Sequence, residues 1–184
     1  MKTRKFLSVA FFAVVLGATS FAQKSVVVGG APMYPTKNII ENAVNSQDHT
    51  TLVAAVKAAG LVETLQGKGP FTVFAPTNTA FGKLPMGTVD TLLKPENLKM
   101  LQTILTFHVI AGKMSTSDLN KAISMGKGKA KIKTVSGGTL TARKKGKKIY
   151  ISDEKGGMAT ITIADVNQSN GVIHVIDAVL LPKS

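Results

Sequence analysis

The chain has 184 residues, no cysteine, and 23 Lys and Arg side chains against 10 Asp and Glu, which gives a formal net charge of +13. The lack of cysteine excludes disulfides, thiolate zinc sites and a lipid-anchored cysteine. A chain of this length suits one domain, which can bury an adequate core without disulfide staples.

The first residues are typical of a secretory signal. Basic residues precede an uncharged apolar run over 6–18, which is shorter than the ~20 apolar residues of a transmembrane helix. Ser20 and Ala22 then supply the small residues that precede a cleavage site ahead of Gln23. We therefore expect residues 1–22 to be a signal peptide and the protein to be secreted, either to a periplasm or outside the cell.

The chain that remains after cleavage is strongly basic. Removing three of the 23 basic residues and none of the 10 acidic ones leaves a net charge of +10. Nearly all of the excess is lysine, because Arg143 is the only arginine after the signal. Lysine is a hydrated point charge, so this composition favours loose attraction to acidic polymers over precise phosphate recognition.

The first part of the mature chain predicts helices. Residues 23–36 contain Gly and Pro without helical periodicity, and we expect a flexible lead with room for one edge strand. Thr36 is a candidate N-cap for a helix over 39–44, and the apolar spacing predicts further helices over 52–59 and 61–65.

The middle of the chain mixes strand and helix patterns. Residues 71–75 alternate between two prolines and predict a strand, after which Thr77 or Asn78 caps a short helix. The remaining predictions here are a helix from Pro95, a strand over 107–111, and a helix from Ser115 or Thr116.

The C-terminal third predicts short strands separated by Gly-containing turns. They span residues 131–135, 139–143, 149–152, 159–164 and 172–179. Helices that come first and strands that come later indicate an α+β fold, and we expect a single domain over residues 37–184.

Three segments together resemble the fasciclin domain. They are Phe-Thr-Val-Phe-Ala-Pro-Thr-Asn-Thr-Ala-Phe over 71–81, Leu-Thr-Phe-His-Val-Ile-Ala-Gly-Lys over 105–113, and Asn-Gly-Val-Ile-His-Val-Ile-Asp-Ala-Val-Leu-Leu-Pro over 170–182. Their order makes the resemblance specific, and it covers roughly 38–182. Phe107 stands where the family usually has tyrosine, so any contact that depends on that hydroxyl is lost.

This resemblance implies a compact β wedge flanked by short helices, with the first and third segments side by side in its middle. It also implies an extracellular or cell-surface protein associated with adhesion, matrix contact, biofilm or host association, and in a few members with carotenoid binding. It carries no catalytic mechanism and no cofactor.

Phe107 and His108 are the first candidate binding site, because the matching motif in animal members is linked to integrin recognition. The alternative is that His108 is a half-buried strand residue paired with a neighbouring carbonyl or hydroxyl. Its apolar neighbours favour the second interpretation, since buried polar groups are normally paired.

Four other polar residues of the motifs have structural explanations. A hydrogen bond of a polar ring among apolar neighbours accounts for His174, and helix capping or turn bonding accounts for Thr77 and Asn78. A bond to a backbone amide accounts for Asp177. We expect no metal site, because only three histidines are present and none has a closely spaced ligand partner.

Two lysine-rich tracts are the second candidate binding site. One has lysines at every second position over 127–133, and the other is the hairpin tip with Lys144, Lys145, Lys147 and Lys148. Both could be a solvated face that protects a sheet edge. They could equally be a patch for anionic polysaccharide, lipid headgroups or extracellular nucleic acid. The absence of tryptophan argues against base stacking on single strands.

The sequence therefore favours a non-enzymatic adhesion or matrix-interaction module. The alternative is a carrier of a small apolar ligand such as a carotenoid, and a more distant one is a hydrolase. The apolar positions of the strongest segments predict a core that includes Phe74, Phe81, Leu101, Ile104, Val175 and Leu180.

Cleavage of the exported protein is expected between Ala22 and Gln23. The intact mass of protein collected outside the cytoplasm measures this directly. A mature chain that still begins at Met1 would contradict the assignment.

Overall fold

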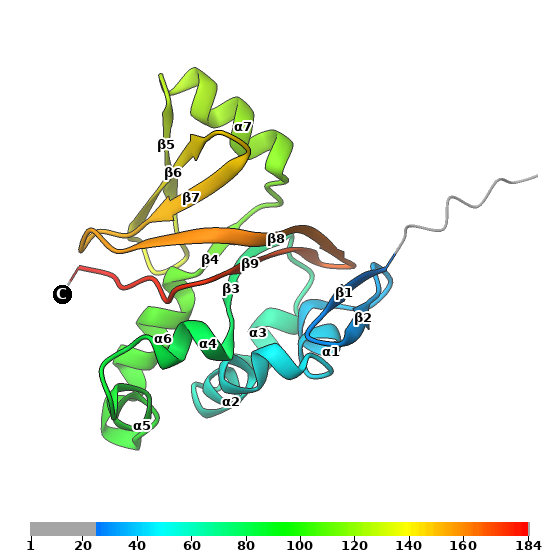
Figure 1. The fold of residues 1–184 in the computed structure, drawn as a ribbon. Helices are drawn as coiled ribbons and strands as arrows, with labels where there is room; N and C mark the ends of the chain where they lie inside the picture. Colours follow the sequence, from blue (N-terminus) through cyan, green and yellow to red (C-terminus); the bar gives the residue numbers. More distant parts are fainter. Residues whose placement is uncertain (1–24, 184) are drawn as a thin grey trace, which may run out of the picture.

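The computed structural model describes residues 25–183, so the predicted signal peptide lies outside the described residues. The fold is α+β, with helices on both sides of a seven-stranded sheet (Figure 1). No helix within residues 25–183 has the length and apolar character needed to cross a bilayer.

The strands are β1 (Val26–Val28), β2 (Ala31–Met33), β3 (Phe71–Pro76), β4 (Val109–Ala111), β5 (Lys129–Lys133), β6 (Thr139–Lys145), β7 (Lys148–Ser152), β8 (Met158–Gln168) and β9 (Gly171–Ile176). The α-helices are α1 (Ile39–Ala43), α2 (Thr50–Ala58), α3 (Val62–Gln66), α4 (Asn78–Gly82), α5 (Thr88–Leu92), α6 (Leu98–Phe107) and α7 (Thr116–Met125), and 3-10 helices span Gln47–His49 and Pro95–Asn97.

A parallel pair of strands, β3 and β9, lies in the middle of the fold. The strand order of the sheet is β4-β3-β9-β8-β7-β6-β5. Strand β3 pairs with β9 in register, from Phe71 opposite Gly171 to Pro76 opposite Ile176. The first and third segments of the fasciclin resemblance therefore run side by side, as expected, although the paired residues Phe71 and Gly171 are 100 positions apart in the sequence (Figure 1).

Both faces of this pair are buried, which explains why the two strands are almost wholly apolar. Val73 and Val175 point into one core, together with side chains of α1, α2, α3 and α6. Phe74 and Ile176 point the other way, into a second core formed with α7 and the inner face of β5–β7. The β3–β9 pair is thus the wall that the two cores share.

The segment before the first helix differs from the flexible lead expected over residues 23–36. Strands β1 and β2 form an antiparallel hairpin, and Val28 and Met33 are each 1% exposed within the helical core. The N-cap of α1 is Asn38 and not Thr36, because Asn38 forms a capping box with Glu41. Asn and Thr are both good N-caps, so the pattern alone did not separate them.

The predicted strand over 107–111 is shorter than expected. Phe107 is the last residue of α6, His108 is the C-cap of that helix, and β4 begins only at Val109. The backbone amide of His108 donates to the Leu105 carbonyl at 3.1 Å, which continues the helical turn. The expectation that His108 is a half-buried strand residue was therefore wrong about its backbone.

Two predicted helix starts are confirmed. The Thr77 hydroxyl accepts a hydrogen bond from the Ala80 amide at the start of α4. Ser115 caps α7 in a capping box with Asp118. These short polar side chains satisfy amides that have no partner within their own helix.

Strand β8 joins two parts of the sheet. Its first residues pair with β7, and its later residues pair with β9 through two register shifts between Ile161 and Val166. Asp165 lies in this irregular stretch with a φ of 55°. Strands β5–β7 continue the sheet away from the central pair and have α7 on one side (Figure 1).

Five of the six predicted core side chains are buried. They are Phe74, Leu101, Ile104, Val175 and Leu180. Phe81 is the exception, because it is only partly buried at the margin of the helical core.

This difference predicts unequal costs for two similar truncations. Phe74→Ala should lower the free energy of unfolding by roughly 3–5 kcal/mol, because the ring is 0% exposed and leaves a cavity. Phe81→Ala should cost clearly less, since solvent already reaches part of the ring. Urea unfolding of both variants measures the difference, and equal midpoints would contradict this assignment of the core.

Candidate functional site

Phe107 and His108, the first candidate binding site, are both inside the protein. Phe107 is 0% exposed and His108 is 3% exposed. The Phe107 ring packs so closely on Gly138 that a Cβ added there would lie 2.5 Å from Cε2 of the ring. In this fold neither side chain is available to a partner.

The His108 imidazole forms two hydrogen bonds that determine its protonation. Nδ1 lies 2.8 Å from the Ile104 carbonyl oxygen, and Nε2 lies 3.0 Å from the Leu180 amide nitrogen. A carbonyl only accepts and an amide N–H only donates, so the ring is neutral with its proton on Nδ1. His108 therefore ties the end of α6 to the extended C-terminal segment, as the structural interpretation of this residue expected.

Burial lowers the pKa of His108 to about 4, although the Ile104 carbonyl and the Asp153 carboxylate favour the charged form. Protonation would add a proton to Nε2 and remove the acceptor of the Leu180 amide. The neutral ring is thus a condition for the contact between α6 and the C-terminal segment.

His174 has a similar structural position in the second core. It is 0% exposed and stacks on Phe74, with the ring centroids 5.7 Å apart. Nε2 donates to the Met114 carbonyl at 2.8 Å, and Nδ1 accepts from the Asp165 amide at 3.3 Å. The Asp165 carboxylate in turn accepts from the amide and hydroxyl of Thr116 at the start of α7. Burial lowers the pKa of His174 as well.

Asn78 and Asp177 also form bonds within the scaffold. The Asn78 amide accepts from the Thr51 backbone at 3.0 Å and donates to the Gln47 carbonyl at 2.8 Å. The Asp177 carboxylate accepts from the Thr160 amide at 2.7 Å. These contacts leave the lysine-rich tracts as the candidate site that solvent can reach.

Strands β5–β7 turn one face toward α7 and the other toward solvent. Apolar side chains occupy the inner face, and alternation places the next residue of each strand on the outer face. We call the outer set the cationic face, and its charged members are Lys129, Lys131, Lys133, Arg143, Lys145 and Lys148.

The strand register joins the two basic tracts into one surface. Lys129 on β5 lies directly opposite Arg143 on β6. Arg143 in turn lies opposite Tyr150 on β7, and Lys145 lies opposite Lys148. Side chains that face each other in this way have Cβ atoms ~5 Å apart, so these charges act on one partner together.

Few acidic residues offset the positive charge of strands β5–β7 and the helix before them. Residues 119–152 contain ten Lys and Arg and no Asp or Glu. Glu154 lies at the corner of this surface near Lys133. Hydrogen bonds from the backbone amides of Lys183 and Thr139 lower the pKa of Glu154 most, and the charges of Lys133 and Lys183 lower it further. The positive charge of the cationic face is therefore reduced at the Lys133 corner.

The four hairpin lysines do not share one direction. All are exposed. Lys145 and Lys148 belong to the cationic face, Lys144 belongs to the α7 side, and Lys147 lies in the turn. Of the four hairpin lysines, only Lys145 and Lys148 therefore lie on the cationic face. Across the strands, this face also includes Lys129, Lys131, Lys133 and Arg143.

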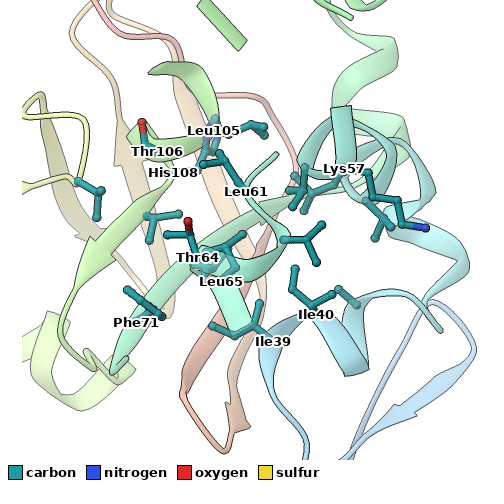
Figure 2. A pocket seen from close by; sticks show the side chains of 18 of the residues that line it. Ile39, Ile40, Lys57, Leu61, Thr64, Leu65, Phe71, Leu105, Thr106 and His108 are labelled. Atoms are coloured by element: carbon teal, nitrogen blue, oxygen red, sulfur yellow. The ribbon is translucent and has the colours of Figure 1, made fainter. Parts of the chain in front are cut away.

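An apolar cavity lies between the helices and β3 (Figure 2). Its volume is ≈70 Å³, and its lining includes Ile40, Leu61, Leu65 and Leu105. Lys57 lies at its margin with the amine turned away from the cavity (Figure 2). Pockets for drug-sized ligands have about 300–1,000 Å³, so a carotenoid does not fit this cavity.

A buried Ser–His pair bears on the hydrolase alternative. Ser46 Oγ lies 2.9 Å from His49 Nδ1, but the two residues are only 2% and 1% exposed. Gly29 packs over the hydroxyl, since a Cβ added there would lie 2.3 Å from Ser46 Oγ. A nucleophile must meet its substrate, and this one is covered.

Within residues 25–183, no three His, Asp or Glu side chains are arranged to hold a metal ion.

The sequence profile of the Fasciclin domain matches residues 47–182, which include the β3–β9 pair and the junction between α6 and β4. The chain belongs to the fasciclin domain family.

Relatives of this fasciclin domain occur in distant organisms. Protein sll1483 of Synechocystis sp. is 44% identical over 169 residues, which are 92% of this chain and 87% of the relative. Cell surface glycolipoprotein MPB83 of Mycobacterium bovis is 34% identical over 147 residues, which are 77% of this chain and 59% of the relative. The FAS1 domain pair of the insect cell adhesion molecule fasciclin I shares the fold, with a TM-score of 0.70 at 19% identity, over 79% of this chain and 51% of that one.

Sequence reasoning missed Tyr150 as a neighbour of the charged residues. Strand alternation over 149–152 puts Tyr150 and Ser152 on one face, but it gives no partner strand. The pairing of Arg143 with Tyr150 appears only in the register of the folded hairpin.

The buried state of His108 predicts a pH dependence of stability. The unfolded chain binds a proton on this ring near pH 6.5, whereas the folded protein does so only near pH 4. The free energy of unfolding should therefore fall as pH drops through this window, by roughly 3 kcal/mol at pH 4 from His108 alone. His49 and His174 have lowered pKa values and act in the same direction.

Urea unfolding of wild type and His108→Gln at pH 7.0, 5.5 and 4.5 measures this contribution. The variant should be less stable at pH 7 by about 1–3 kcal/mol, because a buried donor or acceptor loses its partner. It should also lose less stability on acidification. Parallel curves for the two proteins would contradict the assignment.

Proposed function

We propose that this fasciclin domain is a non-catalytic attachment module that works outside the cytoplasm. It binds an anionic component of a cell surface or matrix through the cationic face and the adjoining hairpin. The observation that carries the proposal is the gathering of six cations on one solvent-facing surface, in a stretch with no acidic residue from 119 to 152. Such a surface attracts polyanions and speeds their association.

Two further observations support this function. The names of two similar proteins describe one as a cell surface glycolipoprotein and the other as a cell adhesion molecule. The predicted signal peptide at residues 1–22 agrees with a site of action outside the cytoplasm.

The absence of a catalytic role is supported by the buried polar groups. His108 and His174 use both ring nitrogens in bonds to the backbone, and the Ser46–His49 pair is covered. The ring nitrogens of His108 and His174 are thus occupied, and a substrate cannot reach Ser46 or His49 because both residues are buried. The partner classes that fit are an anionic polysaccharide or the headgroups of envelope lipids, since lysine charges dominate and bind both.

Attachment through these charges should be sensitive to salt. Wild type should be retained on native envelope material at 0.1 M salt and released toward 1 M, because the screening length falls from ~10 Å to ~3 Å. Replacing Lys144, Lys145, Lys147 and Lys148 with Gln should greatly reduce retention at 0.1 M. The fold should persist, since exposed residues outside special contacts usually change stability by less than ~0.5 kcal/mol.

A charge-matched control separates this surface from net charge. Lys57, Lys68, Lys94 and Lys99 are also exposed, but lie on or beside the helices of the other core. Their replacement with Gln removes the same charge and should leave most of the retention. If both variants and wild type are retained alike at every salt concentration, the proposed function is wrong.

A further inference from the structure

The centre of the cationic face contains an arrangement that charge alone does not explain. Arg143 is the only arginine after Arg4. It stands in a row that crosses three strands, with Lys129 opposite it on one side and Tyr150 opposite it on the other. Arg143 and Lys129 are exposed, and Tyr150 is half-buried.

The three side chains offer different chemistry to one partner. The Arg143 guanidinium is a planar fork that pairs with two oxygens of a carboxylate or sulfate, whereas Lys129 adds a point charge. Tyr150 offers an aromatic surface with a polar end. Such a ring can pack on the C–H face of a sugar while the fork holds its acidic group.

The next row of the same face is rich in hydroxyl groups. Lys131 lies opposite Thr141, and Thr141 lies opposite Ser152. Residues two apart along a strand are ~6.7 Å apart, so the row lies within reach of a ligand held at Arg143. Hydroxyls donate and accept hydrogen bonds, as the neutral hydroxyls of a sugar require.

We propose that Lys129, Arg143 and Tyr150 form a subsite for one acidic sugar of a linear polysaccharide. The subsite rests on the proposed function and names its partner class. The acidic group binds Arg143 and Lys129, the sugar ring packs on Tyr150, and the neighbouring Thr141 and Ser152 bind uncharged hydroxyls. The remaining lysines attract the rest of the chain without selecting its residues.

The alternatives fit this face less well. A surface that binds a bilayer combines basic residues with apolar side chains that enter the interface. None of the large exposed apolar side chains among residues 25–183 lies on β5–β7, and Met158, opposite Ser152, begins β8. Proteins that bind single-stranded nucleic acid stack successive bases on several aromatic rings, and this row has one.

The experiment compares variants that keep the net charge. Tyr150→Leu removes the ring and keeps much of its volume, Tyr150→Phe keeps the ring, and Arg143→Lys keeps the charge but removes the fork. Dissociation constants are measured for polygalacturonate, dextran sulfate, polyglutamate and vesicles of anionic phospholipid, all at one salt concentration. Thermal melting of each variant verifies the fold.

Tyr150→Leu and Arg143→Lys should each weaken binding to a glycan by roughly tenfold, the scale of one lost charge-assisted or packing contact. Tyr150→Phe should stay within about twofold of wild type. Binding to polyglutamate, which has carboxylates but no sugar ring, should not change in Tyr150→Leu or Tyr150→Phe. A loss on polygalacturonate identifies a carboxylate as the acidic group, and a loss on dextran sulfate identifies a sulfate.

Three results would overturn the subsite. The first is wild-type affinity of Tyr150→Leu and Arg143→Lys for both glycans, and the second is an equal loss of affinity of Tyr150→Leu for polyglutamate. The third is tighter binding to the vesicles than to either glycan. If the four-lysine hairpin variant still loses retention on envelope material, the attachment function stands and only the sugar subsite is wrong.

Discussion

The rest of the structure depends on the parallel pairing of β3 with β9, two strands buried on both faces. Residues at the start of β9 fix this pairing. Gly171 lies so close to β3 that a Cβ there would come within 2.1 Å of the Phe71 carbonyl oxygen. The side chain of Asn170 accepts from the Ile39 amide and donates to the Leu65 and Gly67 carbonyls, so the same point also holds α1 and α3. Asn170 and Gly171 thereby hold the central strands together with helices α1 and α3.

The central pair also positions the exposed strands. From β9 the sheet continues through β8 to β7, β6 and β5, and α7 covers the inner face of the last three. His174, Asp165 and Thr116 connect β9, β8 and the start of α7 through hydrogen bonds within the protein. The motif residue His174 thus helps to hold β8 and α7 in place, and the cationic face lies on the strands whose inner side α7 covers.

The sequence predicted the parts of the fold that local pattern controls. Alternation between Pro70 and Pro76 identified β3, the small polar residue Thr77 identified a helix start, and the spacing of Lys129, Lys131 and Lys133 identified one exposed strand face. Family resemblance supplied the pairing of the first and third segments. These signals lie within a few residues of one another, or in motifs already associated with a fold.

Long-range contacts could not be predicted in the same way. The apolar run around His108 fits a strand as well as a buried helix end, and the backbone bond from His108 to the Leu105 carbonyl distinguishes them. The hairpin of β1 and β2 is ordered by burial of Val28 and Met33 against distant helices. The row formed by Lys129, Arg143 and Tyr150 likewise depends on strand register, which periodicity alone does not determine.

We propose that partners meet the outer face of β5–β7 and not the family's histidine motif. Backbone amide chemical shifts, recorded by NMR while polygalacturonate is added, locate the contact directly. We expect the largest changes at Lys129, Arg143 and Tyr150, with smaller changes at residues farther from these strands. Changes concentrated at His108 and the end of α6, or around the apolar cavity at Leu61, with β5–β7 unaffected, would contradict it.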